Sequence, residues 1–182
     1  MKPIIVIAAL VFLNSAHASL GKVQFEAVGR PSMIKIKGEG AGVSSNLQIN
    51  QNKIQGQISF NLETLKTGIG LRDEHMKEKY LEIKQNPLAV LTLTDVQLPL
   101  GWSLQKPNIN SSVFKGKLLL HGTEHEVNGH FNVDSPQIKG EAQFEIKLSD
   151  FNISIPEYLG IKVVDLVKIN VQFDQLKIVS KN

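Results

Sequence analysis

The most constraining feature of the chain is a period of two in the hydrophobicity of its side chains. Apolar or small residues alternate with polar ones from Ile54 to Leu62, from Ile138 to Leu148 and from Ile169 to Asp174. Such alternation is typical of β-strands with one face in the core and the other in water. Weaker alternation occurs at residues 23–27, 34–38, 89–96, 113–121 and 127–134. The sequence therefore predicts an all-β protein of about eight strands.

Turn-forming residues separate most of these segments. Gly122-Thr123-Glu124 and Asp134-Ser135-Pro136 are typical of hairpin turns, and residues 100–112 of a loop. Only residues 71–81 have a helical pattern, so we expect one short helix there.

Eight antiparallel strands with one apolar face can close into a barrel, which removes the free strand edges. Two packed sheets are the alternative, and a period of two does not separate the two architectures. The interior of an eight-stranded barrel is wide enough to be filled by side chains or to hold one small ligand.

Four glycines fall on the apolar faces of predicted strands: Gly56, Gly116, Gly129 and Gly140. Glycine weakens a strand, so its repeated use on this face needs a reason. One interpretation is that the glycines allow bulges and bends in the sheet. The other is that they open a channel for a long, thin ligand.

The N-terminus is typical of a secretory signal peptide. Lys2 precedes the apolar run Ile4–Leu13, and Ala16-His17-Ala18 forms a cleavage site before Ser19. We expect residues 1–18 to be removed, residues 19–182 to form one domain, and the product to be periplasmic or secreted. The apolar run is too short to span a bilayer, so we expect no stable membrane insertion. The chain has no cysteine, which excludes disulfides and cysteine-linked lipids.

The composition argues against nucleic acid as a partner. The formal net charge is only +3, and the lysines are interleaved with acidic residues. Aromatic residues make up 6% of the chain, too few for a platform on which bases stack.

A dense polar cluster at Thr67–Met76 resembles a catalytic site because it contains Arg72, Asp73 and His75. A His–carboxylate pair could transfer protons. However, no G-x-S-x-G motif or other nucleophile accompanies it, and Asp73 and His75 point in different directions on a helix. We therefore expect a solvated helix whose start is fixed by an Arg–Asp pair, and no catalytic residues.

Three histidines lie around one predicted hairpin: His121, His125 and His130. The spacing of His121 and His125 would suit metal binding on a helix, but a turn separates them here. We expect no metal site and no cofactor.

The apolar faces of the strands supply a candidate interior, which could be a packed core or the lining of a ligand cavity. Composition alone favours the packed core. The candidate residues are Phe25, Ile34, Ile36, Ile58, Phe60, Leu91, Leu93, Phe114, Leu118, Phe131, Phe144, Ile146, Val171 and Phe173.

Three groups of residues carry a resemblance to a known family. The first is Thr67-Gly68, Arg72-Asp73, His75-Met76 and Pro87. The second is Gly116-x-Leu118-x-Leu120-x-Gly122-Thr123 with Val127. The third is Asp150-Phe151-x-Ile153-x-Ile155-Pro156 with Gly160, Val163, Asp165, Val167 and Ile169. In their order and spacing they resemble the YceI-like family of bacterial polyisoprenoid-binding, lipocalin-like periplasmic proteins.

The resemblance implies an extended eight-stranded antiparallel lipocalin-like barrel, with no catalysis, whose pore takes an isoprenoid or a similar lipid such as a quinone. It places the lipid chain among the apolar candidates, with its head group near Arg72 or His75, and favours the channel interpretation of the glycines. It also implies a possible homodimer. The alternative is a structural or interaction protein with the same fold and a filled core. A membrane-spanning barrel is a weaker alternative, because the strands lack aromatic belts.

Overall fold

The computed structural model describes residues 21–31, 33–103, 108–134, 139–158, 160–174 and 178–180. The expected signal peptide, and Ser135 and Pro136 of the expected second hairpin turn, lie outside these ranges. Strands dominate the described residues and join into one twelve-stranded sheet. The strands are β1 (Gly21–Arg30), β2 (Ile34–Ala41), β3 (Val43–Asn50), β4 (Lys53–Asn61), β5 (Leu88–Gln97), β6 (Ile109–Leu120), β7 (Thr123–Asp134), β8 (Lys139–Lys147), β9 (Glu157–Tyr158), β10 (Ile161–Val163), β11 (Leu166–Phe173) and β12 (Ile178–Ser180).

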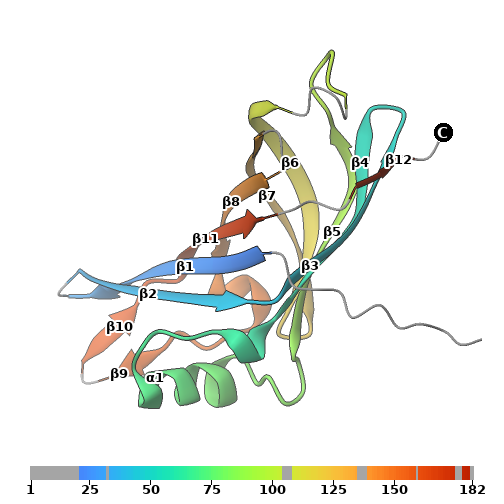
Figure 1. The fold of residues 1–182 in the computed structure, drawn as a ribbon. Helices are drawn as coiled ribbons and strands as arrows, with labels where there is room; N and C mark the ends of the chain where they lie inside the picture. Colours follow the sequence, from blue (N-terminus) through green and yellow to red (C-terminus); the bar gives the residue numbers. More distant parts are fainter. Residues whose placement is uncertain are drawn as a thin grey trace, which may run out of the picture.

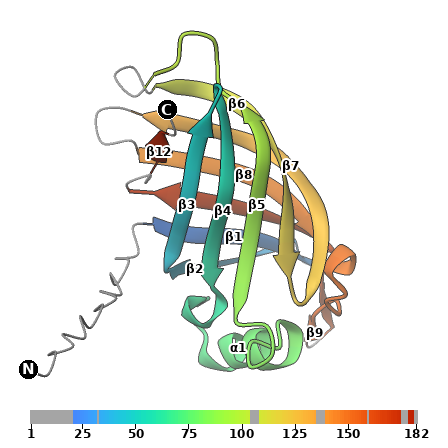
Figure 2. The same ribbon diagram turned by 90° about the vertical axis from the view of Figure 1, so that its right-hand side faces the viewer.

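The sheet curls around its apolar face (Figures 1 and 2). Neighbouring strands follow the order β12-β3-β4-β5-β6-β7-β8-β11-β1-β10-β9, and β2 pairs with β1. All these pairs are antiparallel except β12 with β3. Only Gly42, at a φ of +103°, separates β2 from β3, a conformation that favours glycine. The bend at Gly42 therefore lets one continuous segment join both ends of the curled sheet.

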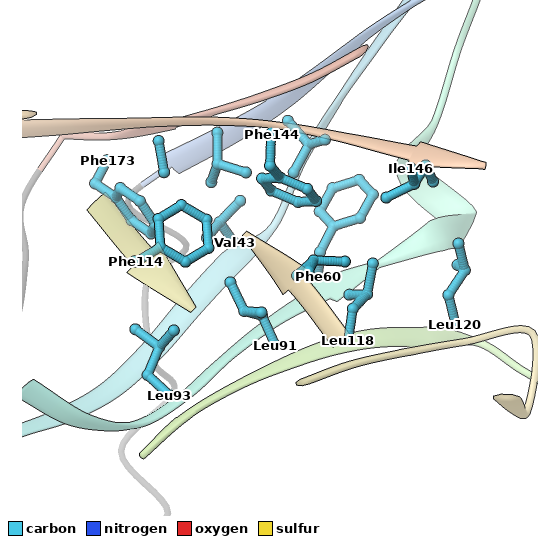
Figure 3. Packing of buried hydrophobic residues seen from close by; sticks show 14 of the residues in the cluster. Val43, Phe60, Leu91, Leu93, Phe114, Leu118, Leu120, Phe144, Ile146 and Phe173 are labelled. Carbon is cyan, nitrogen blue, oxygen red and sulfur yellow. The ribbon is translucent and has the colours of Figure 1, made fainter. Parts of the chain in front are cut away.

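The strand alternation predicted from the sequence is confirmed by the burial pattern. Along β8, for example, Ala142, Phe144 and Ile146 are buried, whereas the intervening Gln143 and Glu145 are exposed. The buried faces of all the long strands meet in one hydrophobic core. Figure 3 shows side chains from several strands converging in it.

The expected number of about eight strands differs from the twelve observed. The sequence analysis missed β3 (Val43–Asn50), because Ser45 interrupts the alternation of Val43, Leu47 and Ile49. It also missed the short strands β9, β10 and β12. The expected loop at residues 100–112 is too long, since β6 already begins at Ile109. When the segment bent at Gly42 is counted as one strand, the long strands form the expected eight-stranded curl.

The expected helix at residues 71–81 is confirmed as α1 (Gly70–His75), which continues as the π-helix η2 (Met76–Tyr80). Two single-turn 3₁₀ helices were not expected, η1 (Leu62–Thr64) and η3 (Leu148–Phe151). Figures 1 and 2 place α1 across one end of the curled sheet. Within the described ranges, no helix has the length and hydropathy needed to cross a membrane.

Three of the four glycines interpreted as opening a channel do not do so. A Cβ atom on Gly116 would lie 2.9 Å from side-chain atoms of Leu91 and Leu93. One on Gly129 would collide with the carbonyl oxygen of Gln143. Gly56 lies at a bulge in the pairing of β4 with β5. These glycines therefore permit close packing and bending of strands, and the channel interpretation is wrong for them.

We expect the Gly129→Ala substitution to lower the free energy of unfolding by about 1–3 kcal/mol, because backbone and Phe144 have no room for a methyl group. Gly70→Ala is the matched control, since a Cβ atom there meets nothing within 4 Å. Urea unfolding of both variants measures the difference. Equal stability of the two variants would contradict the close packing at Gly129.

Candidate functional site

A cavity of about 550 Å³ opens from the interior of the curled sheet at the end covered by α1. Its lining is almost entirely apolar. The polar side chains among the lining residues are Thr67, Arg72, His75, Tyr80 and Glu157. The apolar lining comes from most of the strands, from the helical elements and from the segment between η3 and β9; the strands are β1, β2, β3, β4, β5, β6, β8, β10 and β11, and the helical elements are η1, α1, η2 and η3.

Most of the side chains predicted from the sequence to form the interior line this cavity. They are Phe25, Ile34, Ile36, Ile58, Phe60, Leu91, Leu118, Phe144, Ile146, Val171 and Phe173, together with Arg72 and His75. Their contact with a ligand remains a prediction.

Three predicted ligand-binding residues lie outside the cavity lining: Leu93, Phe114 and Phe131. Phe114 packs edge-on against Phe144, with 6.0 Å between the ring centroids. Leu93 and Phe114 are buried in the core, and Phe131 packs against it. Figure 3 shows Leu93 and Phe114 among the packed side chains of the core. These side chains fill the part of the interior beyond the cavity, because aromatic rings meet there and close it.

The opening of the cavity is marked by lining residues that are also exposed to solvent. They are Ile34 on β2, Ile69, Leu71 and His75 at α1, and Glu157 on β9. The rim therefore comes from three elements that are far apart in the sequence. Figure 1 shows the β1–β2 hairpin, α1 and the β9–β10 hairpin grouped at this side of the sheet.

The polar cluster at Thr67–Met76 is organised around Thr67. Arg72 donates hydrogen bonds from Nε to Thr67 Oγ1 at 2.7 Å and from Nη2 to the Thr67 carbonyl at 3.0 Å. Asp73 Oδ1 accepts from the Thr67 backbone N–H at 2.7 Å and from its hydroxyl. Arg72 and Asp73 thus fix the entry to α1 by holding Thr67, rather than by the direct Arg–Asp pair that was expected.

Arg72 and His75 both reach the cavity, but they differ in their surroundings. Two nitrogens of Arg72 are engaged with Thr67, which fixes the guanidinium at the rim. His75 is exposed, and no hydrogen bond to another described residue holds its ring. A fixed cation beside an adjustable imidazole can meet the polar end of an amphiphile.

The three histidines of the predicted hairpin do not converge. His121 Nδ1 lies 3.0 Å from the Phe151 carbonyl, and its Nε2 lies 2.8 Å from Glu82 Oε2. His125 packs edge-on against the Phe151 ring, and His130 is exposed on β7. Among the residues that the structure describes, no group of three or more metal-ligating side chains forms. The role of His121 here is to tie the β6–β7 turn to η3 and to the segment after η2.

Sequence reasoning missed a second group of lining residues, which belong to short or irregular elements. Most of these positions lie outside the alternating segments and gave no signal beyond their hydrophobicity, whereas Leu62 and Leu148 end alternating segments but were not predicted as lining. They include Leu62, Leu65, Ile69, Leu71, Met76, Tyr80, Leu81, Leu148, Ile153, Pro156, Ile161 and Val163.

The turn η3, which carries the lining residue Leu148, is held by Asp165. The carboxylate accepts hydrogen bonds from Ser149 N at 2.9 Å and from Ser149 Oγ at 2.6 Å. The bond from the Ser149 hydroxyl is the main cause that holds the pKa of Asp165 below its usual value. Bonds of this kind favour the charged form of a carboxyl group.

A curled antiparallel sheet with an apolar cavity open at one end defines a lipocalin-like β-barrel. The model of the YceI-like domain matches residues 13–174, and the chain belongs to the YceI-like family. No curated protein matched the sequence.

Two solved structures illustrate the fold. Burkholderia cenocepacia BcnA aligns with a TM-score of 0.64 at 20% identity, over 84% of this chain and 94% of that one. A polyisoprenoid binding domain from Saccharophagus degradans, implicated in plant cell wall breakdown, aligns with a TM-score of 0.64 at 14% identity. That alignment covers 85% of this chain and 93% of that domain. At these identities the likeness establishes a shared fold.

We expect Thr67→Val to lower the free energy of unfolding by about 1–2 kcal/mol, because it removes the hydroxyl that links Arg72 to Asp73. Thr67→Ser keeps that hydroxyl and is the matched control. Hydrogen exchange of the α1 and η2 amides should accelerate in the valine variant. Unchanged exchange in Thr67→Val would show that the hydroxyl does not hold the helix.

We expect Asp165→Asn to remove a pH-dependent part of the stability. The pKa of Asp165 is lower in the folded protein than its ordinary value of 3.8. Its contribution is therefore present above about pH 3.8 and is lost as the pH falls through the folded value. The wild type should exceed the variant by about 0.5–1.5 kcal/mol at pH 7, and the gap should narrow in acid. Urea unfolding of the wild type and the variant at pH 7 and in acid tests this. A difference in unfolding free energy that is the same under both conditions would contradict it.

Proposed function

We propose that this protein binds one isoprenoid or similar amphiphilic lipid in its cavity and carries or sequesters it without chemical change. The observation that supports this is the open cavity of about 550 Å³, whose lining is apolar except at a few positions. Cavities of roughly 300–1,000 Å³ with this character are typical of small-molecule sites.

The energetics favour a lipid chain as the occupant. Burial of apolar surface contributes about 0.8 kcal/mol for each CH₂ group, so a few isoprene units supply a large gross affinity without polar contacts. Aliphatic and aromatic side chains such as Ile36, Phe60 and Phe144 line the route inward. Specificity then depends on the length of the cavity and on its rim.

The polar end of the lipid is expected to lie at the rim, near Arg72 and His75. Thr67 holds the Arg72 guanidinium in place, so it can donate to an oxygen of a head group. A quinone carbonyl or the hydroxyl or phosphate of a polyprenyl compound has such an oxygen. No nucleophile or metal is needed for this role, which supports a binding protein rather than an enzyme.

The family and the fold support the same proposal. The Saccharophagus degradans structure is a polyisoprenoid binding domain, and its fold matches this one. The typical signal peptide at residues 1–18 supports a periplasmic or secreted location, where a carrier could pass a water-insoluble lipid between membranes. The alternative protein with a filled core is less well supported, because the described side chains leave the cavity open.

Native mass spectrometry of protein purified from its own periplasm tests the proposal. We expect a mass increment that lipid extraction identifies as an isoprenoid or related amphiphile. Absence of any copurified lipid, together with no binding of a prenyl-chain probe to the delipidated protein, would overturn it.

We expect Ala89→Leu to weaken binding of a prenyl-chain probe about tenfold or more. Ala89 lines the cavity on β5, and the added carbons occupy space that ligand methylenes would fill. Leu93→Met is the matched control, because Leu93 lies on the same strand outside the lining and the change conserves volume. Probe titration measures both. Equal affinities would show that the probe binds elsewhere.

A further inference from the structure

Four large apolar side chains are exposed together at the rim of the cavity. Met33 is 61% exposed, Ile69 54%, Leu71 53% and Ile34 45%. Ile34, Ile69 and Leu71 line the cavity, and Met33 is next to Ile34 in the turn of the β1–β2 hairpin. They belong to the β1–β2 hairpin and to the start of α1, which both contribute to the cavity lining, so their exposure marks its opening.

The other exposed apolar side chains among the described residues do not gather in this way. Leu88 is on β5, Val113 and Leu119 are at separate positions along β6, Leu166 is on β11, and Leu100 follows β5. Figures 1 and 2 show the β5–β6 connection at the end of the sheet opposite α1. Single exposed apolar residues are ordinary, whereas a group of them marks an interaction surface.

Cations without acidic partners lie next to this apolar rim. Arg30 on β1 is directly opposite Lys162 on β10, and neither forms an ion pair with any described residue. Two like charges placed opposite each other destabilise a sheet. Lys35 and Lys37, on the neighbouring strand β2, share the single carboxylate of Glu26.

Acidic groups are also present near the rim. Glu157 is opposite Lys162 in the β9–β10 register, and Glu74 lies in α1. The two hairpins beside the opening carry more basic than acidic side chains, so positive charge prevails there; the basic residues are Lys22, Arg30, Lys35, Lys37 and Lys162, and the acidic residues are Glu26, Glu39 and Glu157.

We propose that this rim docks on the surface of an anionic lipid bilayer, with Met33, Ile69 and Leu71 inserted among the lipids and with Arg30 and Lys162 against their head groups. This inference rests on the proposed function and adds the place where the lipid enters. Insertion of apolar side chains together with attraction of cations to anionic lipids is the usual basis of peripheral membrane binding.

Charge favours a bilayer over a second copy of this chain as the occupant. A twofold dimer places the same patch on both subunits. It would bring the unpaired Arg30 and Lys162 of one subunit toward those of its partner, and like charges across an interface oppose binding. An anionic bilayer supplies the missing negative charge and keeps the opening in contact with lipid.

Sedimentation with vesicles tests the proposal on the full secreted protein. The vesicles contain phosphatidylcholine alone or phosphatidylcholine with phosphatidylglycerol. Met33→Asn removes an apolar side chain at a φ of 53°, which asparagine tolerates well. Arg30→Gln combined with Lys162→Gln removes the opposed cations. None of these three residues lines the cavity, so binding of a soluble prenyl-chain probe should stay unchanged.

We expect the wild type to prefer the anionic vesicles, and each lost cation to lower its partition coefficient about fivefold. Met33→Asn should lower it about tenfold. Leu100→Asn and the pair Lys22→Gln and Lys115→Gln are matched controls away from the rim, and they should partition like the wild type; Lys22 lies at the opposite end of β1 from Arg30.

The outcomes separate this inference from the proposed function. Probe binding without vesicle binding would overturn the docking proposal alone. Vesicle binding reduced by the rim variants, in a protein that binds no probe, would support docking and overturn the lipid carrier. Equal loss in rim and control variants would show general electrostatic adsorption and overturn docking by the rim. Self-association in analytical ultracentrifugation that Met33→Asn abolishes would identify the rim as a dimer interface and overturn it as well.

Discussion

The structure depends on one constraint: the apolar faces of its strands must be buried against one another, because the helical elements in the described part of the chain are too short to cover them. Curling the sheet meets this need. Gly42 permits the bend that connects β2, paired with β1, to β3, paired with β4. Beyond the cavity the interior is closed by aromatic packing, such as Phe114 against Phe144. Toward α1 the side chains on these faces leave the interior unfilled, and the cavity lies there.

The polar cluster that resembles a catalytic site is better explained by a structural role, because its hydrogen bonds hold the start of α1 in place. In Arg72 and Asp73, two charged side chains hold one threonine, and together they fix the element that forms part of the rim. His121 likewise holds the segment that follows η2, because its ring contacts both Glu82 and the Phe151 carbonyl of η3. Charged residues here position the opening of an apolar cavity.

The sequence predicted those parts of the molecule that obey a simple period. Strands such as β8, and the inward direction of Phe144 and Ile146, follow from alternation. The strand β3 was missed because Ser45 breaks the alternation, although tertiary pairing with β4 holds it extended.

The lining residues Ile153, Pro156, Ile161 and Val163 were missed because irregular segments and strands of two or three residues are too short to carry a periodic signal. The glycines were misread, since an absent side chain can serve either an open channel or a close contact. Only the neighbours of Gly116 and Gly129 decide between these. The location of the cavity therefore depends on tertiary geometry that local pattern does not encode.

An apolar cavity that opens at a lipid surface also resolves an energetic difficulty of carrying lipids. The gross gain of about 0.8 kcal/mol per buried CH₂ makes release into water slow for any long chain. A bilayer offers the chain nearly the same apolar surroundings, so the net free energy of transfer between cavity and membrane is small even when both hold the lipid firmly. In the proposed docking, a rim with exposed Ile69 and Leu71 would remove the aqueous step between cavity and membrane. Chain length would then scarcely affect the direction of transfer, and polar contacts at Arg72 and His75, as proposed, would determine which lipid is retained.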